Sequence, residues 1–396
     1  MRLTFTTSLC IFCLVHVGPA LTQDGGFSPA EMARKALQEP FVGVTTDGTP
    51  EPDLFVIKPP RPSMEPVRKA ARAFLESLSE RQRSETVFPI DSEQWRHWSN
   101  FHQFPGRAGV MIEEMTDTQR QAAYDLLRAS LSAKGYETSR DIMRLNSHLA
   151  ELVNNFEQYG EHKYWVTMFS DPSSDEPWGW QFEGHHLVIN YFLLGDQLVM
   201  TPTFMGSEPV RAESGKYAGT EVLQDVQDAG LAFMMSLSES QREEAIIGRK
   251  QGRSSALGEL FKDNIVVPYE GLAANRLSEA SRRVLIDLIT LYVENLPPGH
   301  AELKMNEVLE HIDETHFAWR GGTDADSVYY YRIQSPVIFI EFDHQGPIAL
   351  EGSEPTRNHV HTVVRTPNGN DYGRDLLKQH YQAMETDAGH GHVQRP

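Results

Sequence analysis

The stretch Trp178-Gly-Trp-Gln-Phe-Glu-Gly-His-His-Leu-Val-Ile-Asn190 decides how the rest of the chain is interpreted. It is rich in aromatic and β-branched residues and is bounded by turns that contain Pro and Gly, which is the pattern of β-structure. It also brings one carboxylate, Glu183, close to two adjacent histidines, His185 and His186. The stretch therefore predicts a sheet that carries a polar pocket.

Helical patterns come before this strand-like stretch. The expected helices cover 67–78, 117–131 and 139–156, and the expected strands that follow cover 164–169 and 182–194. The spacing of the apolar residues is helical in the first group, and Thr116 is the expected N-cap of the second helix. Lys134-Gly135 is its expected stop. Helices followed by strands predict an α+β fold.

The same order of elements returns in the second half of the chain. Ala73-Phe-Leu-Glu-Ser-Leu-Ser-Glu-Arg-Gln-Arg83 resembles Ala232-Phe-Met-Met-Ser-Leu-Ser-Glu-Ser-Gln-Arg242, and similar matches follow in order after both segments. Two copies are too few for a solenoid. We therefore predict an internal duplication with two related helices-then-strands modules, at 67–222 and 223–382. Chance similarity between amphipathic helices is the alternative.

Both ends of the chain differ from these modules. Arg2, the apolar run Leu9–Val17 and the small residues up to Ala20 predict a signal peptide over residues 1–20. We expect an extended arm at 21–66, a disordered tail at 383–396, and a secreted or periplasmic protein. Both cysteines, Cys10 and Cys13, lie in the signal peptide. The mature chain would therefore lack disulfides and cysteine ligands.

The net charge is −19 over 396 residues. This charge argues against nucleic acid, because binding to phosphates depends on Lys and Arg side chains that release counterions. It also argues against anionic membrane surfaces. We expect a small-molecule substrate or ligand instead.

Two downstream segments, Ile340-Glu-Phe-Asp-His344 and His359-Val-His-Thr-Val-Val-Arg365, accompany the opening stretch. Residues two apart in a strand share a face, so His359, His361 and Arg365 would point the same way. Glu341 and Asp343 would share a face of the other strand. If the two strands pair antiparallel, these groups meet on one surface.

We predict that this surface, with the opening stretch, binds a divalent metal ion, either zinc or iron. The expected ligands are His185, His186, Asp343, His359 and His361. Imidazole and carboxylate ligands without cysteine suit these metals. A site with two histidines and one carboxylate leaves positions open for water or substrate. A polar pocket without metal and a purely structural hydrogen-bond network are the two alternatives.

Further residues are candidates for catalysis and substrate binding. Glu183 or Glu341 would act as general base, and Arg365 would hold a carboxylate or phosphate. The expected substrate contacts are Trp178, Trp180, Asn190, Thr203 and Arg365. Packing in the core is the alternative for the two tryptophans.

These residues favour a metal-dependent hydrolase in an exported protein. A metal- or small-ligand-binding protein without turnover is the alternative from another class, and a metal-dependent oxidoreductase is the alternative within enzymes. An open coordination position beside a free carboxylate would indicate the enzyme.

The segments also resemble a known family. The residues that carry the resemblance are Trp178-Gly-Trp-Gln-Phe-Glu-Gly-His-His-Leu187, Thr201-Pro-Thr-Phe-Met-Gly206 and His359-Val-His-Thr-Val-Val-Arg-Thr-Pro-Asn-Gly-Asn-Asp-Tyr-Gly373. They are similar to the domain-of-unknown-function 3500 family, over about Glu65 to Gln382. The resemblance implies no activity, because none is established for that family.

Overall fold

The computed structural model describes residues 29–58, 62–102, 104, 106–260 and 262–390. The helices are α1 (Pro29–Gln38), α2 (Glu65–Ser77), α3 (Glu80–Thr86), α4 (Asp117–Ser130), α5 (Ala133–Val153), α6 (Gln224–Ser236), α7 (Glu239–Ala245), α8 (Glu279–Val293), α9 (Pro298–Glu310) and α10 (Arg374–His390). Short 3-10 helices are η1 (Glu93–Arg96), η2 (Ile112–Glu114), η3 (Ala274–Arg276), η4 (Ile312–Glu314) and η5 (Asp371–Gly373). The strands are β1 (Val87–Phe88), β2 (Val110–Met111), β3 (Tyr164–Phe169), β4 (Trp178–Gly184), β5 (Leu187–Leu194), β6 (Gln197–Val199), β7 (Thr203–Ser207), β8 (Ile246–Gly248), β9 (Leu272–Ala273), β10 (His316–Gly321), β11 (Tyr329–Gln334), β12 (Phe339–His344) and β13 (Val360–Arg365).

All these strands belong to one 13-stranded sheet with the main order β1-β3-β4-β5-β7-β13-β12-β11-β10-β8. The two halves of the chain use the same plan. A short strand lies parallel to β3 in the first half and to β10 in the second, and antiparallel hairpins follow in both. The halves join in the sheet where β7 pairs antiparallel with β13. The α+β prediction is confirmed, and both halves contribute to a single sheet.

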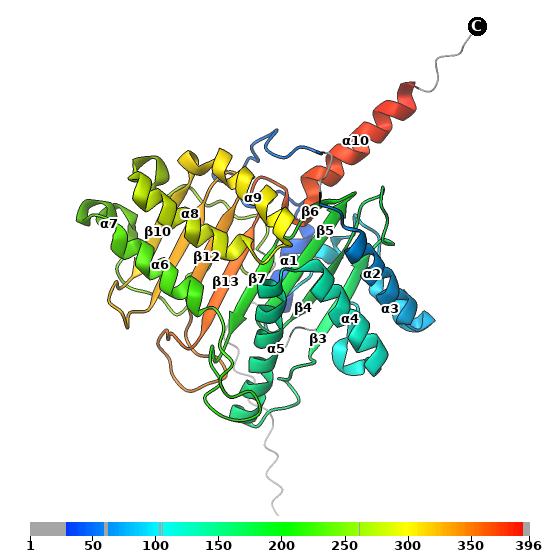
Figure 1. The fold of residues 1–396 in the computed structure, drawn as a ribbon, viewed down its shortest axis with the longest axis horizontal. Helices are drawn as coiled ribbons and strands as arrows, with labels where there is room; N and C mark the ends of the chain where they lie inside the picture. Colours follow the sequence, from blue (N-terminus) through cyan, green and yellow to red (C-terminus); the bar gives the residue numbers. More distant parts are fainter. Residues whose placement is uncertain (1–28, 59–61, 103, 105, 261, 391–396) are drawn as a thin grey trace, which may run out of the picture.

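The sheet has two different faces. Helices α2 to α9 cover one face in both halves (Figure 1), and the main apolar core lies beneath them. Ile340 and Phe342 of β12 belong to that core, whereas Glu341 and Asp343 point to the opposite face. Mainly loops cover this second face, together with η1, α1 and the start of α10. The predicted alternation along β12 is therefore confirmed.

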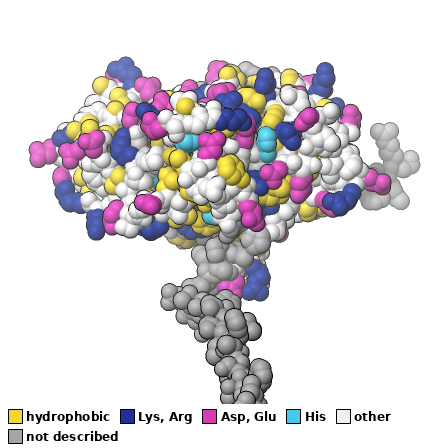
Figure 2. All heavy atoms as spheres, turned by 90° about the horizontal axis from the view of Figure 1, so that it is seen from below, with side chains coloured by type: hydrophobic (Ala, Val, Ile, Leu, Met, Phe, Trp, Pro, Cys, Tyr) yellow, Lys and Arg dark blue, Asp and Glu magenta, His cyan; other side chains and the backbone are white. Residues whose placement is uncertain are grey.

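Short local signals explain how the helices begin. Thr116 accepts a hydrogen bond from the backbone N–H of Gln119, as expected of the N-cap of α4. The same capping box opens α3 at Ser79 and α7 at Ser238, at corresponding places in the two halves. Acidic and basic side chains are interspersed on the outer surface, with apolar side chains between them (Figure 2).

Two predicted boundaries are wrong. Lys134-Gly135 does not stop a helix: α5 begins at Ala133 behind the N-cap Ser132. At Gly135 an added Cβ would lie 2.5 Å from the backbone oxygen of Asn295, so a close approach explains this glycine. The strand expected over 182–194 is a hairpin, β4 and β5, whose turn is His185-His186.

The C-terminal prediction also needs correction. Helix α10 continues to His390, so residues 383–390 are helical where a disordered tail was expected. The predicted signal peptide and residues 391–396 lie outside the described residues.

A buried carboxylate ties the two halves together on the loop-covered face. Asp263 accepts a hydrogen bond of 2.9 Å from Arg96 Nε of the first half and one of 3.0 Å from Arg365 Nη1 of β13. The Tyr372 hydroxyl donates to the same carboxylate at 2.9 Å. The side chains of Asp263 and its two arginines are at most 1% exposed. The carboxylate therefore pairs with both guanidinium groups away from bulk water.

We expect Asp263→Ala to lower the free energy of unfolding by about 3–5 kcal/mol, because it leaves two buried guanidinium groups short of a partner. The matched control is Asp171→Ala, which removes a 73% exposed carboxylate paired with Arg83. This loss should be at most about 1 kcal/mol. Urea unfolding of both variants measures the difference, and equal losses would contradict the role given to Asp263.

Candidate metal centre

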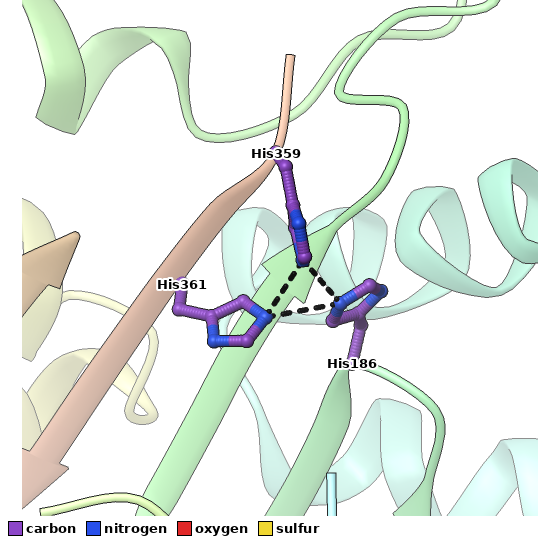
Figure 3. Close-up of side chains that lie close together, drawn as sticks. All are labelled: His186, His359 and His361. Carbon is purple, nitrogen blue, oxygen red and sulfur yellow. Dashed lines mark hydrogen bonds between the residues drawn. The ribbon is translucent and has the colours of Figure 1, made fainter. Parts of the chain in front are cut away.

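Three buried imidazoles meet near the centre of the sheet (Figure 3). The Nε2 atom of His186 lies 3.1 Å from the Nε2 atoms of both His359 and His361, and these two are 3.0 Å apart. His186 comes from the β4–β5 turn, His359 directly precedes β13, and His361 lies within β13. Their exposed fractions are 4%, 1% and 5%. This group, called the histidine triad below, can hold a metal ion.

Strand order brings the three residues together. Strand β7 lies between β5 and β13, and Gly206 of β7 stands opposite His361. The Gly206 N–H donates to the backbone oxygen of His186 at 2.8 Å. A Cβ atom at Gly206 would lie 2.7 Å from the Val360 oxygen and 3.1 and 3.2 Å from the rings of His361 and His186. Glycine is therefore required where the triad crosses β7.

The backbone of His186 has an unusual conformation. Its φ is +63°, in the left-handed region that few residues other than glycine adopt. The turn between β4 and β5 is closed tightly by the pairing of Gly184 with Leu187. Such backbone conformations are often found at functional sites. Here the turn directs the His186 ring towards β13.

Hydrogen bonds on the far side of two rings orient them. Nδ1 of His359 lies 2.9 Å from the Gly346 carbonyl oxygen, and Nδ1 of His361 lies 2.5 Å from Oε1 of Glu259. Both partners are acceptors, so each Nδ1 carries a hydrogen, and in the neutral form of either ring the Nε2 atom then presents a lone pair. Two lone pairs 3.0 Å apart repel each other unless a cation lies between them.

Burial disfavours a proton on two of the three rings. Burial, together with the neighbouring imidazoles, lowers the pKa of His186 and of His359 well below the usual range. Neutral imidazole is the form that binds metal ions. With nitrogen–metal bonds of about 2.0–2.1 Å, the observed triangle gives N–metal–N angles of about 95°. An ion held by these three nitrogens alone would keep at least one coordination position for water or substrate.

The predicted ligand Asp343 is not in the triad. Its carboxylate accepts the N–H groups of Ser255 at 2.7 Å and Ala256 at 3.1 Å. Glu341 lies two residues before Asp343 in β12, and its carboxylate accepts the N–H groups of Leu257 at 2.8 Å and Gly258 at 2.7 Å. Both carboxylates are thus used to fasten the segment that carries Glu259. Neither carboxylate joins the triad, so the structure gives no support for the metal role predicted for Asp343 or for the base role predicted for Glu341.

Arg365 serves the same segment. Its Nε donates to the Gly258 carbonyl at 2.7 Å and its Nη2 to the Leu260 carbonyl at 3.1 Å, while Nη1 pairs with Asp263 and Asp371. The side chain is fully buried and all its nitrogens donate within the protein. It is therefore not available to a substrate, which corrects both roles predicted for it.

Glu183 fastens a corresponding loop in the first half. It accepts hydrogen bonds of 3.2 Å from Arg107 Nε and from the Ser99 N–H. Burial raises the pKa of Glu183 to about 6, and the Arg107 charge opposes this shift. The carboxylate is held by the loop rather than presented to the triad, so the structure gives no support for its predicted role as base.

The predicted substrate contacts are placed elsewhere. Trp178 and Trp180 are at most 1% exposed and pack in the core under the helices, so the core alternative holds for both. Asn190 is buried and bonds to Gln181 and to the Pro202 carbonyl. Thr203 donates to the Met200 carbonyl. The side chains of this set do not join the triad.

His185 lies beside the triad without joining it. Its ring stacks on that of His186 with centroids 3.9 Å apart. Its Nδ1 is 2.8 Å from Oδ1 of Asn146, an acceptor, so Nε2 is the unprotonated nitrogen. Burial and nearby histidines lower the pKa of His185 well below the usual range. It is therefore a neutral imidazole next to the triad.

Sequence reasoning missed three residues around the triad. Glu259 comes from a loop without a recognisable motif. Glu208 follows β7, accepts the backbone N–H groups of Ile348, Ala349 and Leu350, and lies 3.8 Å from Nδ1 of His359. Asn100, whose backbone oxygen accepts the His186 N–H, is buried with both side-chain amide atoms unpartnered among the described residues. Contacts between segments far apart in sequence bring these three residues to the triad, so no local sequence pattern could have indicated them.

Comparison with known proteins adds one finding. No curated protein and no solved structure matches the chain. Among the described residues, no helix combines the length and the apolar character needed to cross a membrane. The family model described as "Protein of unknown function (DUF3500)" matches residues 61–374. With most of its length matched, including every member of the histidine triad, the chain belongs to the DUF3500 family.

Proposed function

We propose that the protein is a metal-dependent enzyme, with hydrolysis as its reaction, built on the histidine triad. One observation carries the proposal: three buried Nε2 atoms lie within 3.1 Å of one another, and that of His359, whose Nδ1 hydrogen is held by the Gly346 carbonyl, presents a lone pair to the other two. Burying such a group without a cation would be unfavourable. A divalent ion stabilises it directly.

The number of ligands favours a catalytic site over a structural one. Structural zinc usually has four protein ligands, whereas catalytic zinc has three and keeps one position for water or substrate. Within the described residues the triad has three members and no carboxylate joins it. The metal would supply a water molecule of lowered pKa.

The surrounding side chains have distinct roles in this proposal. Glu259 holds the Nδ1 hydrogen of His361 and so orients the ring and increases its basicity. The Nε2 atom of His185, free of a hydrogen and beside His186, would accept a hydrogen bond from a water molecule held there. The unpartnered amide of Asn100 supports a polar substrate group on this side, because a buried amide without a partner is costly.

A metal-binding protein without turnover is the second candidate. It is favoured by the burial of the triad, whose members are at most 5% exposed. Iron in place of zinc would instead favour an oxidoreductase, because iron can change its oxidation state.

Three broader features complete the proposal. The N-terminal pattern supports export to the periplasm or outside the cell, and the acidic surface supports a small-molecule substrate. The matching capping boxes and strand order of the two halves support their origin by duplication.

The first experiment is elemental analysis of the purified protein by mass spectrometry. We expect about one equivalent of zinc or iron, and at least a tenfold loss in a His359→Ala/His361→Ala double variant. Circular dichroism checks that the variant is folded. Zinc would support hydrolysis and iron would support redox chemistry. A folded wild-type protein that stays without metal after incubation with zinc and ferrous ions would overturn the proposal.

Glu259→Gln tests the support behind His361. We expect metal affinity to fall about 10- to 100-fold, because the neutral amide no longer stabilises the Nδ1 hydrogen as a carboxylate does. The control is Glu270→Gln, which changes a half-exposed carboxylate paired with Arg332 in the following segment. Competition with a chelator of known affinity measures both. Unchanged affinity in Glu259→Gln would exclude the role given to Glu259.

Gly206→Ala tests the geometry of the triad while keeping every ligand. The added methyl group would press on the rings of His186 and His361, so we expect at least a tenfold loss of metal affinity. Gly252→Ala is the control, because its Cβ would meet no atom closer than 3.6 Å. The same chelator competition applies, and a folded Gly206→Ala protein with full affinity would contradict the close contact at β7.

A further inference from the structure

Helix α1 lies on the same face of the sheet as the triad, opposite to helices α2 to α9 (Figure 1). The chain just after it is firmly seated, because Val44 is fully buried in a cluster with Val267 and Phe339. The helix itself is not. Ala36 and Leu37 are half-buried, and the other α1 side chains that the structure describes are exposed. Helix α1 therefore stands on a fixed base but contributes little to the core.

Hydrogen bonds from Arg96 fasten the C-terminal end of α1. The guanidinium group donates to the carbonyl oxygens of Ala36 and Glu39, each at 3.0 Å. A cavity of about 520 Å³ is bounded by α1 and by residues 262–265, so packing beneath the helix is incomplete. Arg96 also pairs with the Asp263 carboxylate at 2.9 Å. Its buried charge would therefore keep a partner if the helix left.

Helix α1 covers an apolar seam between two loops, one from each half of the chain. Phe101 and Phe104 come from the loop of the first half, and Leu260 comes from the loop of the second half. Phe104 and Leu260 are 7% and 6% exposed with the helix in place, and Ala36 of α1 packs against this pair. The helix thus bridges the two loops from outside.

Both of these loops also contact the triad. Glu259 directly precedes Leu260 and lies 2.5 Å from Nδ1 of His361. In the other loop, the backbone oxygen of Asn100 accepts the N–H of His186 at 3.1 Å. The triad rings are at most 5% exposed in this arrangement. The seam under α1 therefore leads towards a site that is closed while the helix is in place.

The chain offers a hinge where α1 ends. Pro40 and Val42 are both bonded to the Asn264 side chain at 2.8 Å, through the carbonyl oxygen of the first and the N–H of the second. Gln38 and Glu39 lie between this anchor and the helix, and both are exposed. A segment with few buried apolar contacts can open locally while the rest of the fold stays intact.

We propose that α1 is a displaceable lid over the histidine triad. When the helix turns about Gln38 and Glu39 and leaves the seam, ions and small molecules reach the triad between the two loops. The proposal rests on the proposed function in one respect, because it takes the triad as the site to be reached. Lids of this kind shield a site from water and admit its ligand when they open.

Hydrogen exchange in the full-length wild-type protein tests whether α1 opens. We expect the amides of residues 34–38 to exchange about tenfold faster or more than those of residues 361–364 in β13, because few buried contacts hold the helix. Equal protection of the two segments would overturn the proposal.

Histidine modification measures access to the triad. Diethyl pyrocarbonate reacts with neutral imidazole, and peptide mass spectrometry of the full-length protein gives the rates at His186, His359 and His361. Treatment with a chelator beforehand ensures that no bound ion protects the rings. We expect slow reaction in the wild type, because the rings are at most 5% exposed.

Ala36→Asp should displace the lid. We expect the three histidines to react about fivefold faster or more than in the wild type, because the new carboxylate would otherwise be buried against the apolar seam. Gln38→Asp is the matched control, since it adds the same charge at an exposed position of the same helix. It should react like the wild type. Circular dichroism checks that both variants are folded, and hydrogen exchange of residues 34–38 reports whether α1 has left.

Two results would overturn the lid. One is an unchanged rate at the three histidines in an Ala36→Asp protein whose α1 has lost its protection. The other is an α1 that stays protected in that variant, because the seam contact would then not hold it. The metal content of the wild type is measured separately. A protein without metal whose histidines react faster in Ala36→Asp would contradict the proposed function and leave the lid in place.

Discussion

The antiparallel pairing of β7 with β13 is the interaction on which the triad depends. It joins the two halves of the sheet and sets His361 opposite Gly206, which itself receives the backbone of the His186 turn. A shift of one residue in this pairing would turn His361 to the helix-covered face. Two segments that are far apart in sequence therefore meet at the centre of the sheet, and their histidine rings lie close enough to bind one ion.

Buried carboxyl groups and a buried guanidinium group on the loop-covered face hold the next layer in place. Burying an ionised side chain is unfavourable unless its hydrogen bonds are satisfied. Glu341, Asp343 and Arg365 satisfy theirs with the backbone of residues 255–260, the loop that delivers Glu259 to His361. These three polar residues resemble catalytic residues in the sequence, but in the structure they hold the loop that carries Glu259. They position the carboxylate that orients one ring of the triad.

One strand serves both faces of the sheet. Successive residues of β13 contribute His361 to the triad and Thr362 to a cavity on the helix-covered face. The two environments are only a sheet thickness apart, yet they share no side chain. Loops with many buried hydrogen bonds cover the first, and helices with apolar faces enclose the second.

The sequence by itself determined what depends on neighbouring residues. Alternation along β12 and β13 follows from the strand backbone, so the shared faces of His359 with His361, and of Glu341 with Asp343, were predictable. Capping at Thr116 is equally local. The tertiary structure decided which side chains meet. It placed His186 with His359 and His361, left His185 and Asp343 aside, and brought in Glu259 and Asn100. The physical reason is that such meetings depend on strand order, pairing register and loop closure over long separations in sequence, none of which a short pattern encodes.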